Sequence, residues 1–540
     1  MTIKRSSALR VSRNFIWLFA KIVIGLTFIL SLWIVLANLI TPFSTGQSGG
    51  LLLTRGQAVL LFGLVLFAIV LIAIWHKFAK LRNFIHDHRT LFVAIAIGLV
   101  SLVGFLARMA LVAQPNVPLS NDPAMYFSEA QSVAQNGKLV SGSSGTALVL
   151  SPPVNDRQYY ALFPYLTSYT TMLAGAMKIS GTSYTTAIIL NLLFDAAGAV
   201  IFYRLIKRLT KSQNWALVGF GLWVLSPFEI CFSVLSLPVV VVNFAVVLAL
   251  WLILLMLESR HDSRKFFLLT LAIGLTLGFA NILRPIFTVV VILLLILYLA
   301  ILLREKNRWK VKFAKILFSF LLVLVPFFAL NIGQNLITEN LTGYKDVNSR
   351  AGWSVFVGAN FATNGEFNWP DANIISVATK ATNPAAAQRQ MLADGLARYQ
   401  HMAPLDFAKL LVKKSIVFSG NQGTAAYQKN GVASWLHNPH IGSLIIDAST
   451  WYLVALLVFA GVFLAQFFRR LSRKFIWSPS RIFLVFATAW FLVLYCAMLL
   501  VEAMNRYFQP FLPLVMLFAI LGAAGLTAKF REKSAKILER

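Results

Sequence analysis

The sequence predicts an all-α polytopic membrane protein: a bundle of about 12 to 13 transmembrane helices, with amphipathic helices in its extracytoplasmic loops. Hydrophobic residues make up 58% of the 540 positions and charged residues only 12%, which is more apolar surface than a water-soluble domain buries. The apolar residues fall into runs of about 20, the length that crosses a bilayer. Short basic clusters separate the runs, as cytoplasmic loops do.

The apolar runs define the expected spans. A further run, 160–180, contains several hydroxyls, a proline and a lysine, so whether it crosses the membrane stays open. The first run follows a basic N-terminus and is too long for a cleaved signal peptide, so we expect an uncleaved span. The runs long enough to cross are 14–40, 57–75, 91–113, 184–203, 214–230, 238–257, 266–283, 286–303, 314–333, 450–468, 482–501 and 508–528.

The basic clusters indicate the side of each loop. With the N-terminus inside, crossings by these runs place every cluster in the cytoplasm, whereas a crossing at 160–180 would move most clusters outside. We therefore expect 160–180 to be re-entrant or interfacial, and both termini to be cytoplasmic. The clusters are 76–89, 204–211, 258–265, 304–312, 468–481 and 529–540.

Three regions follow from this topology. Residues 1–333 form an N-terminal transmembrane module that includes the outer loop 114–159. Residues 334–449 form a large extracytoplasmic loop, and residues 450–540 form the last transmembrane helices and a basic cytoplasmic tail. All the long segments outside the membrane therefore face the extracytoplasmic side.

The remaining composition excludes several classes. The net charge of +29 comes from basic clusters beside the spans, so membrane electrostatics explains it and nucleic acid is not an expected partner. The two cysteines, Cys231 and Cys496, form no disulfide or zinc-binding pattern. The cytoplasmic loops lack a Gly-rich nucleotide loop, and no internal repeat is visible, which argues against an inverted-repeat transporter.

The segment "NDPAMYFSEAQSVAQNG" carries a rare acidic residue at the membrane edge. Asp122 before a proline predicts the start of an amphipathic helix, with Tyr126 and Val133 on the apolar face and Glu129 on the solvated face. Two roles for Asp122 stay open. It is a helix cap, or it is a general base at the rim of a cavity.

Arg284 interrupts two strongly apolar runs in "GFANILRPIFTVVV". An arginine at membrane depth costs about 2.5–3.5 kcal/mol on insertion scales unless it is paired or reaches water. It therefore either snorkels to the outer interface or binds an anionic headgroup, because the guanidinium fork suits phosphate.

The late turn "VEAMNRYFQPFLP" supplies three polar side chains at the same rim. Glu502 and Arg506 have the i,i+4 spacing of an intrahelical ion pair, and Tyr507 has the position of an interfacial aromatic. A carboxylate, a guanidinium and a phenol in one turn also suit a sugar-phosphate site, so both interpretations stay open.

The loop segment "RAGWSVFVGANFATNGEFNWPD" is rich in glycine, asparagine and aromatic residues. Trp353 is a candidate for stacking on a sugar, and Asn360 for hydrogen bonding to its hydroxyls. The alternative is a turn-rich loop that packs on the bundle.

Taken in order, these features resemble polytopic glycosyltransferases of the GT-C class, in particular the family 39-like group of bacterial protein O-mannosyltransferases and lipid A aminoarabinose transferases. The matching features are an acidic first outer loop, an "LRP" helix break, the "GWSVFVGANFATNGEFN" loop and the "EAMNRYFQPFLP" turn. They extend over nearly the whole chain. The resemblance implies a GT-C-like bundle in a bacterial plasma membrane.

The resemblance also implies an activity: transfer of a sugar from a polyprenyl-phosphate carrier to an acceptor hydroxyl on the outer face. Asp122 matches the catalytic base, and Arg284 and Arg506, with Tyr507, match the donor-phosphate contacts. Glu502, Tyr126, Trp353 and Asn360 are expected to contact substrate. The expected partners are membrane lipids, the carrier-linked sugar, and an acceptor that is a cell-envelope polymer or a protein.

The sequence departs from the family at two places. The family has Asp-Glu where Asp122-Pro123 stands, and a His-Pro-Pro segment is missing before 160–180. We therefore take Asp156 as the second catalytic carboxylate from its loop position alone. The sequence identifies no resident cofactor or metal ligand, and it leaves a divalent cation open.

Two other functions remain as alternatives. A transporter or flippase of lipid-linked saccharide needs charged or broken helices inside the membrane, whereas the charges singled out here gather at the outer rim. An envelope polysaccharide polymerase or ligase also has a large outer loop and arginines, and it consumes a pyrophosphate-linked oligosaccharide.

Overall fold

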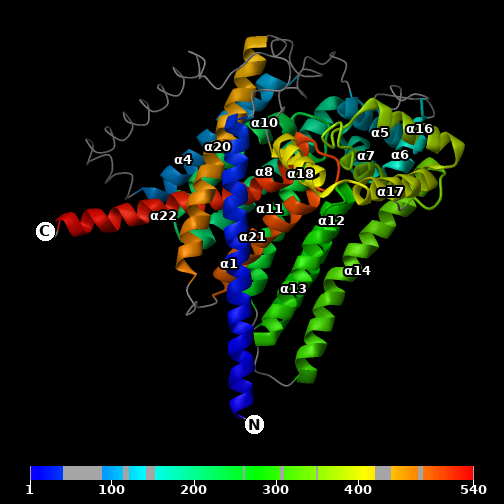
Figure 1. Cartoon of the computed structure of the whole chain (residues 1–540). Helices are drawn as coiled ribbons and strands as arrows, with labels where there is room; N and C mark the ends of the chain where they lie inside the picture. Colours follow the sequence, from blue (N-terminus) through cyan, green and yellow to red (C-terminus); the bar gives the residue numbers. More distant parts are fainter. Residues whose placement is uncertain are drawn as a thin grey trace.

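The computed structural model describes residues 2–40, 88–112, 121–140, 153–259, 262–304, 309–347, 351–419, 439–471 and 478–538. Every regular element in these ranges is helical (Figure 1). The predicted all-α class is therefore confirmed. The expected span 57–75 lies outside the described residues.

Within the described ranges, nine helices are long and apolar enough to cross a membrane, so the protein is a multi-pass membrane protein. Two further runs are represented by helices that differ from a simple span: α9 (Gln213–Val224) and α10 (Pro227–Ser233) are bent by 47° at a break, and α13 (Thr288–Arg304) is shorter in its apolar part. The nine lie in α1 (Thr2–Ile40), α4 (Arg89–Leu111), α8 (Tyr184–Thr210), α11 (Val239–Glu258), α12 (Ser263–Leu283), α14 (Trp309–Thr342), α20 (Pro439–Arg470), α21 (Pro479–Met498) and η3 (Asn505–Phe511) continuing into α22 (Leu512–Leu538).

The spans differ in how much protein surrounds them. In α11, 72% of the most apolar window is buried inside the protein, so this helix forms the centre of the bundle. In α4 the corresponding share is 6%. Among the spans of the described ranges, α4 has the smallest buried share.

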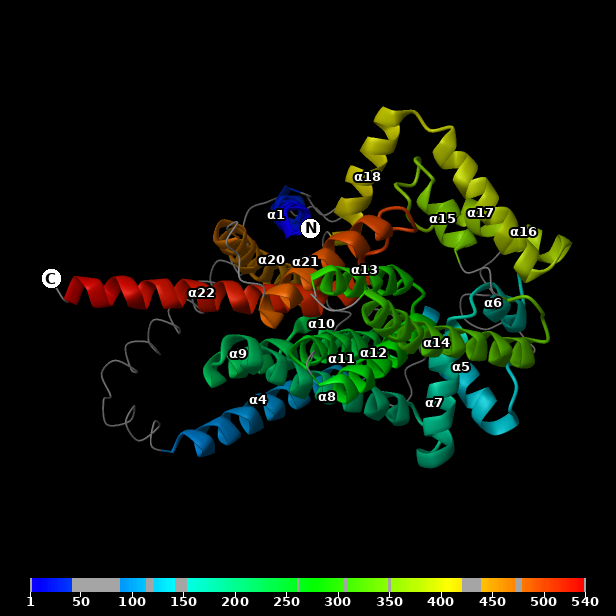
Figure 2. The same cartoon turned by 90° about the horizontal axis from the view of Figure 1, so that it is seen from below.

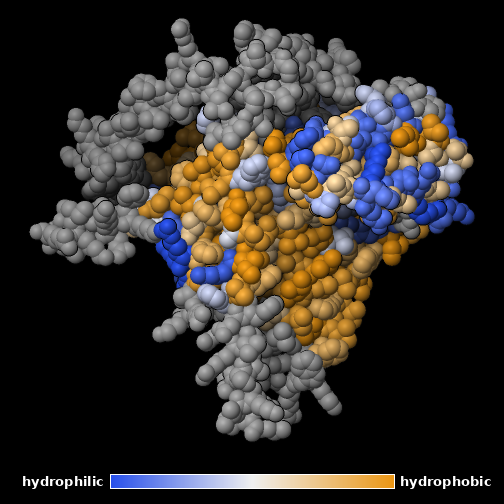
Figure 3. Space-filling view, in the orientation of Figure 1, coloured by the Kyte–Doolittle hydropathy of each residue, from blue (hydrophilic) through white to orange (hydrophobic). Residues whose placement is uncertain are grey.

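A lid, residues 351–419, covers one end of the bundle together with the short helices that follow α4. Figures 1 and 2 show α16, α17 and α6 on the side of the bundle away from α4. The space-filling view shows a hydrophilic surface there, beside the apolar flank formed by α12–α14 (Figure 3). These helices are α5 (Asn121–Asn136), α6 (Asp156–Leu162), α7 (Leu166–Ser180), α15 (Gly352–Gly358), α16 (Trp369–Ala381), α17 (Pro384–Gln400) and α18 (Pro404–Ser419).

Local sequence explains where the lid helices begin. Asn368 and Asn383 each accept a hydrogen bond from a backbone N–H in the first turn, and a proline follows each cap. Asparagine caps and proline at the first helical positions are a strong start signal. The beginning of α1 lies at the opposite end of the bundle from the lid (Figure 1).

The doubtful run 160–180 is divided. α6 ends at Leu162, the chain turns at Phe163–Tyr165, and α7 begins at Leu166. With 15 residues, α7 is about 22 Å long, which is less than the roughly 30 Å of a bilayer core. Residues 160–180 are therefore not a continuous transmembrane helix.

Candidate functional site

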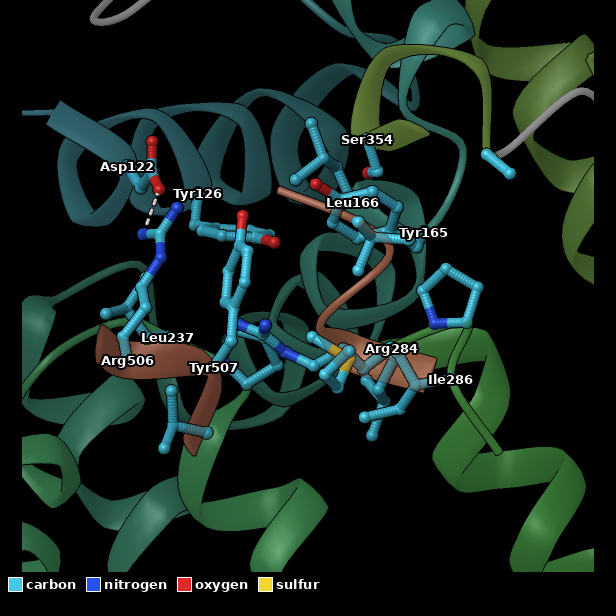
Figure 4. Close-up of a pocket in the computed structure, with 17 residues that line it drawn as sticks. Asp122, Tyr126, Tyr165, Leu166, Leu237, Arg284, Ile286, Ser354, Arg506 and Tyr507 are labelled. Atoms are coloured by element: carbon cyan, nitrogen blue, oxygen red, sulfur yellow. Dashed lines mark hydrogen bonds and ion pairs between the residues drawn. The ribbon is translucent and has the colours of Figure 1, made fainter. Parts of the chain in front are cut away.

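A cavity of about 140 Å³ lies under the lid, where the ends of several helices meet (Figure 4). Its walls combine a carboxylate, two arginines and three tyrosines with apolar side chains. The lining residues are Asp122, Tyr126, Tyr165, Leu166, Leu237, Pro238, Val239, Leu283, Arg284, Pro285, Ile286, Ala351, Ser354, Met498, Val501, Arg506 and Tyr507.

Asp122 and Arg506 form an ion pair across the cavity wall. Asp122 lies in the first turn of α5, as the sequence predicts, and Arg506 lies in η3. Their side chains retain 19% and 14% of their exposure. A ligand can therefore reach the pair, while partial burial lowers the local dielectric constant and strengthens the interactions of its charges.

Arg284 contributes the second positive charge. It follows the last residue of α12, and its guanidinium lies 4.4 Å from the centre of the Tyr507 ring. Within the described ranges it has neither a hydrogen bond from its side chain nor an ion pair. A partly buried guanidinium that stacks on an aromatic ring but has no anionic partner is suited to bind an anion.

Glu502 lies behind the cavity wall rather than on it. The carboxylate is almost fully buried, and it accepts a hydrogen bond from Tyr507 Oη at 3.0 Å. Burial raises its pKa, which Arg506 and the hydrogen bonds from Tyr507 and Trp353 partly offset. Glu502 thus orients the Tyr507 ring, on which Arg284 lies.

Of the two interpretations of the late turn, the intrahelical ion pair of Glu502 with Arg506 is wrong. α21 ends at Met498 and the next helix begins at Asn505, so no helix joins the two side chains. Arg506 extends to Asp122, on another element. Arg506 lies in the short 3-10 helix η3, which contains Pro510 and passes into α22 just before Pro513.

Tyrosines complete the cavity. Tyr126 is buried and lies edge-to-face against Tyr169, with ring centres 5.4 Å apart. Tyr165, which sequence reasoning missed, also lines the cavity. Burial raises the pKa of Tyr165 to about 12, although Arg284 and Arg506 lower it, so the phenol stays a hydrogen-bond donor at neutral pH. The Pro164 break before α7 is the sequence signal that could have revealed it.

Trp353 and Asn360 lie outside the cavity. Trp353 is 7% exposed and packs between Phe163 and Phe367. Asn360 donates to Asp371 at 2.9 Å, within a polar cluster that joins α16 to α17. Of the two interpretations of this loop, the geometry fits packing on the bundle, because neither side chain lines the cavity.

Two other acidic residues lie away from the cavity as well. Asp156 is fully buried at the start of α6 and is not among the lining residues. Glu129, expected on a solvated face, is also fully buried and accepts a hydrogen bond from the backbone N–H of Val140 at 2.9 Å. The prediction that Glu129 lies on a solvated face is therefore wrong. In the part of the chain that the structure describes, no group of three or more His, Cys, Asp or Glu side chains could hold a metal ion.

A second charged cluster lies inside the spans, which the sequence reasoning missed. Arg108 of α4 forms an ion pair with Asp195 of α8 at 2.6 Å, and both side chains are buried. The view that the ionisable groups gather only at the outer rim is therefore incomplete. The two residues are 87 positions apart, so no local spacing could have shown the pair.

Among solved structures, the chain is similar to the oligosaccharyltransferase AglB from Archaeoglobus fulgidus, in complex with an inhibitory peptide and a dolichol-phosphate, at 13% identity and a TM-score of 0.43. The match covers 84% of this chain but 52% of AglB, so the chain spans about half the length of that protein. ArnT from Cupriavidus metallidurans matches in its apo state at 15% identity and a TM-score of 0.35.

ArnT bound to undecaprenyl phosphate matches at 14% identity and a TM-score of 0.33, and both ArnT matches cover 81% of this chain and 78% of ArnT. Both proteins are GT-C glycosyltransferases, the class that the sequence resembles. At these TM-scores the likeness assigns no donor, acceptor or residue role. No protein-family model and no curated protein matches the sequence.

Proposed function

We propose that the protein is a membrane glycosyltransferase, which moves a sugar from a polyprenyl-phosphate carrier to an acceptor hydroxyl at the lid end of the bundle. The observation that carries the proposal is the cavity itself. It holds one carboxylate, Asp122, and two guanidinium groups, of which Arg284 has no anionic partner in the described ranges.

The arginines suit the phosphate of the carrier. A lipid phosphate must enter from the membrane, and the apolar wall residues Leu283 and Ile286 lie directly beside Arg284. Guanidinium groups bind phosphate oxygens through paired N–H donors. Tyr165, which also lines the cavity, adds a neutral hydrogen-bond donor. The charge on these donors would stabilise the phosphate anion as it leaves.

The proposed reaction needs no redox partner. The acceptor oxygen attacks the anomeric carbon of the sugar, and the bond from that carbon to the phosphate oxygen breaks. Polyprenyl phosphate departs as an anion, held by Arg284 and Arg506. The acceptor hydroxyl loses its proton to Asp122, which acts as general base. A proton on Asp122 then passes to solvent, which restores the carboxylate.

The test uses purified full-length protein with a defined polyprenyl-phosphate sugar and a hydroxyl acceptor. We expect release of free polyprenyl phosphate, and an Asp122→Asn rate that is about 10²- to 10⁴-fold lower, the usual contribution of a general base. Asp406→Asn is the matched control, because Asp406 is an exposed lid aspartate paired with Lys409. A fully active Asp122→Asn protein would remove Asp122 from the mechanism.

Binding of the carrier is tested separately from turnover. Arg284→Gln should weaken binding of polyprenyl phosphate, measured directly on the purified protein, whereas Arg389→Gln on the exposed face of α17 should not. Unchanged binding in Arg284→Gln would exclude Arg284 as the phosphate contact. Consumption of only a pyrophosphate-linked oligosaccharide would instead indicate the polymerase or ligase alternative.

The site is proposed to face outward from a bacterial plasma membrane, with both termini in the cytoplasm. Thiol labelling of Lys345→Cys and Arg208→Cys in intact cells checks this. Lys345 follows α14, Arg208 lies in the last turn of α8, and the two positions are expected on opposite sides of the membrane. Labelling of Lys345→Cys alone by a membrane-impermeant reagent is the expected result. The reverse pattern would place the cavity on the cytoplasmic side.

A transporter of lipid-linked saccharide is the second candidate, because one observation favours it. The Arg108–Asp195 pair lies inside the spans, next to the break between α9 and α10, and such features are typical of transport pathways. Liposomes that contain the purified protein distinguish the two functions. Movement of the carrier lipid between leaflets without any new glycosidic bond would support transport.

A further inference from the structure

The break between α9 and α10 exposes backbone carbonyls inside the bundle, and neighbouring helices satisfy them. The carbonyl oxygen of Val224 accepts a hydrogen bond from Arg108 at 2.9 Å, and that of Leu222 accepts one from Tyr452 at 2.7 Å. The second half, α10, begins with Pro227. The broken helix is therefore fixed to α4 and α20.

The positive charge at this break is already neutralised. Arg108 donates to Asp195 Oδ2 at 2.6 Å, and its other hydrogen bonds go to Ser233 Oγ and to the carbonyl oxygens of Gly104 and Val224. Asp195 also accepts from the Trp223 indole at 2.8 Å. One guanidinium and one carboxylate leave no net charge in this pair.

Glu229 of α10 is a further acidic group beside the pair, and it is 1% exposed. Its Oε1 accepts a hydrogen bond from Asn243 Nδ2 of α11 at 2.6 Å. Its Oε2 and the Asn243 Oδ1 are both buried, and neither has a hydrogen-bond partner among the described residues. The charged and titratable groups that act on it from the packed helices are Arg108 (α4), Asp195 (α8) and Tyr452 (α20).

A single proton would explain why Glu229 Oε2 and Asn243 Oδ1 both lack a partner, although Glu229 and Asn243 already share one hydrogen bond. A carboxylic acid and a primary amide can form a ring with two hydrogen bonds, in which the amide N–H donates to one oxygen and the acid O–H donates to the amide oxygen. One proton on Oε2 would supply the missing donor for both atoms. An ionised Glu229 would leave both oxygens unsatisfied and add an unbalanced charge.

We propose that Glu229 and Asn243 form a membrane-embedded proton-binding site, in which the Glu229 carboxyl group holds a proton on Oε2 and donates it to Asn243 Oδ1. The ligand is the proton alone, and no other ion is required. This proposal does not rest on the transfer reaction proposed above.

The location gives this site an effect on the cavity. Glu229 and Asn243 bracket the turn 234–238, which connects α10 to α11. Leu237 and Pro238 of this turn line the cavity, and Ser236 Oγ donates to the carbonyl oxygen of Pro123 at 2.6 Å. The bound proton therefore ties together the two helices that hold the wall next to Asp122.

The test compares the full-length wild type with Glu229→Gln in detergent. Glutamine reproduces the protonated acid, because its N–H can donate to Asn243 Oδ1 while its oxygen accepts from Asn243 Nδ2. Glu258→Gln is the matched control, because Glu258 is a partly exposed residue at the end of α11, paired with Arg208. The measurements are thermal unfolding from about pH 5 to about pH 9 and the infrared carbonyl stretch of protonated carboxyl groups.

The sign of the pH effect follows from proton counts. Where the native protein holds the proton and the unfolded chain does not, raising the pH favours unfolding. We expect the unfolding constant of the wild type, divided by that of Glu229→Gln, to rise up to about tenfold per pH unit. The carbonyl band should weaken in Glu229→Gln and persist in Glu258→Gln.

Three results would overturn the proposal. The first is failure of Glu229→Gln to fold, because the substitution should preserve both hydrogen bonds. The second is a stability difference from the wild type that does not change with pH. The third is an unchanged carbonyl band together with stabilisation by added sodium, which would indicate an ionised Glu229 bound to a cation.

Discussion

The buried amine of Lys414 should make the stability of the lid depend on pH. Lys414 lies in α18 and is fully buried. Its Nζ donates to the carbonyl oxygen of Gly358 at 2.8 Å and to Tyr399 Oη at 3.3 Å. Burial lowers its pKa to about 7, and the carboxylate of Glu502 partly opposes this.

The size of the effect follows from proton linkage. In the unfolded chain the amine is protonated below its ordinary pKa of 10.5, whereas in the native protein it stays neutral down to about 7. Between these values the unfolded state binds more protons, so the free energy of unfolding rises with pH, by up to about 1.4 kcal/mol per pH unit. Across the whole window the gain is roughly 5 kcal/mol, and it is lost again as the pH falls towards 7.

Lys414→Met removes the titrating amine and keeps an unbranched side chain that is one atom shorter. The lost hydrogen bond to Gly358 should cost about 1–3 kcal/mol at every pH, but the variant should lack the rise in stability between about pH 7 and about pH 10. Lys413→Met, the exposed neighbouring lysine, is the control. Burial also raises the pKa of Tyr399, so this phenol does not titrate in the window.

The assay is thermal unfolding of the purified protein across this pH range, combined with limited proteolysis of the lid. The wild-type and Lys413→Met curves should rise together, and the Lys414→Met curve should stay flatter. Parallel curves for all three proteins would refute the reasoning, because they would show that the Lys414 amine titrates equally in the native and unfolded states.

Three further predictions concern stability. Arg108→Met should lower the free energy of unfolding by about 3–5 kcal/mol because it leaves Asp195 buried and unpaired; Arg108→Met with Asp195→Leu should lose less, and thermal unfolding that shows an equal loss would contradict this. Gly358→Ala should destabilise the lid by about 1–3 kcal/mol, because its Cβ would lie 2.5 Å from the Val501 carbonyl carbon; Gly333→Ala, where nothing lies within 4 Å, is the control in the same unfolding assay. Burial raises the pKa of Asp371, but hydrogen bonds from Arg398, Asn360 and Asn368 outweigh it and lower the pKa overall, so the stability it contributes should be lost as the pH falls below about 4. Protease sensitivity of the lid should rise there in the wild type, and an equal rise in Asp371→Asn would contradict this.

The three charged residues of the cavity could be predicted, unlike Tyr165, because each stands near the end of an apolar run. Asp122 and Arg284 adjoin prolines that end or begin helices, and Arg506 lies in a proline-rich turn. When successive helices alternate in direction, these ends meet on one side of the membrane. Periodicity and charge were therefore enough to bring the three residues together, although their roles stay predictions.

The remaining features depend on contacts that no local pattern encodes. Glu129 lies on the polar face of α5, but α7 packs against that helix, and the backbone N–H of Val140 donates a hydrogen bond to the Glu129 carboxylate. Trp353 is in a Gly-rich loop, yet aromatic side chains from two other segments enclose it. Such burial results from tertiary packing. Sequence spacing therefore predicted the wrong environment for both Glu129 and Trp353.

The contact between Asp122 and Arg506 has a consequence for the sequence of events in the cavity. The Arg506 guanidinium forms an ion pair with Asp122, the carboxylate that would have to accept a proton in the proposed transfer. In the proposed transfer, the phosphate of the carrier would compete with Asp122 for Arg506, and Asp122 would be released by that exchange. If the cavity performs the proposed transfer, the carrier lipid must therefore arrive before the acceptor, and an acceptor that comes first finds the carboxylate still engaged.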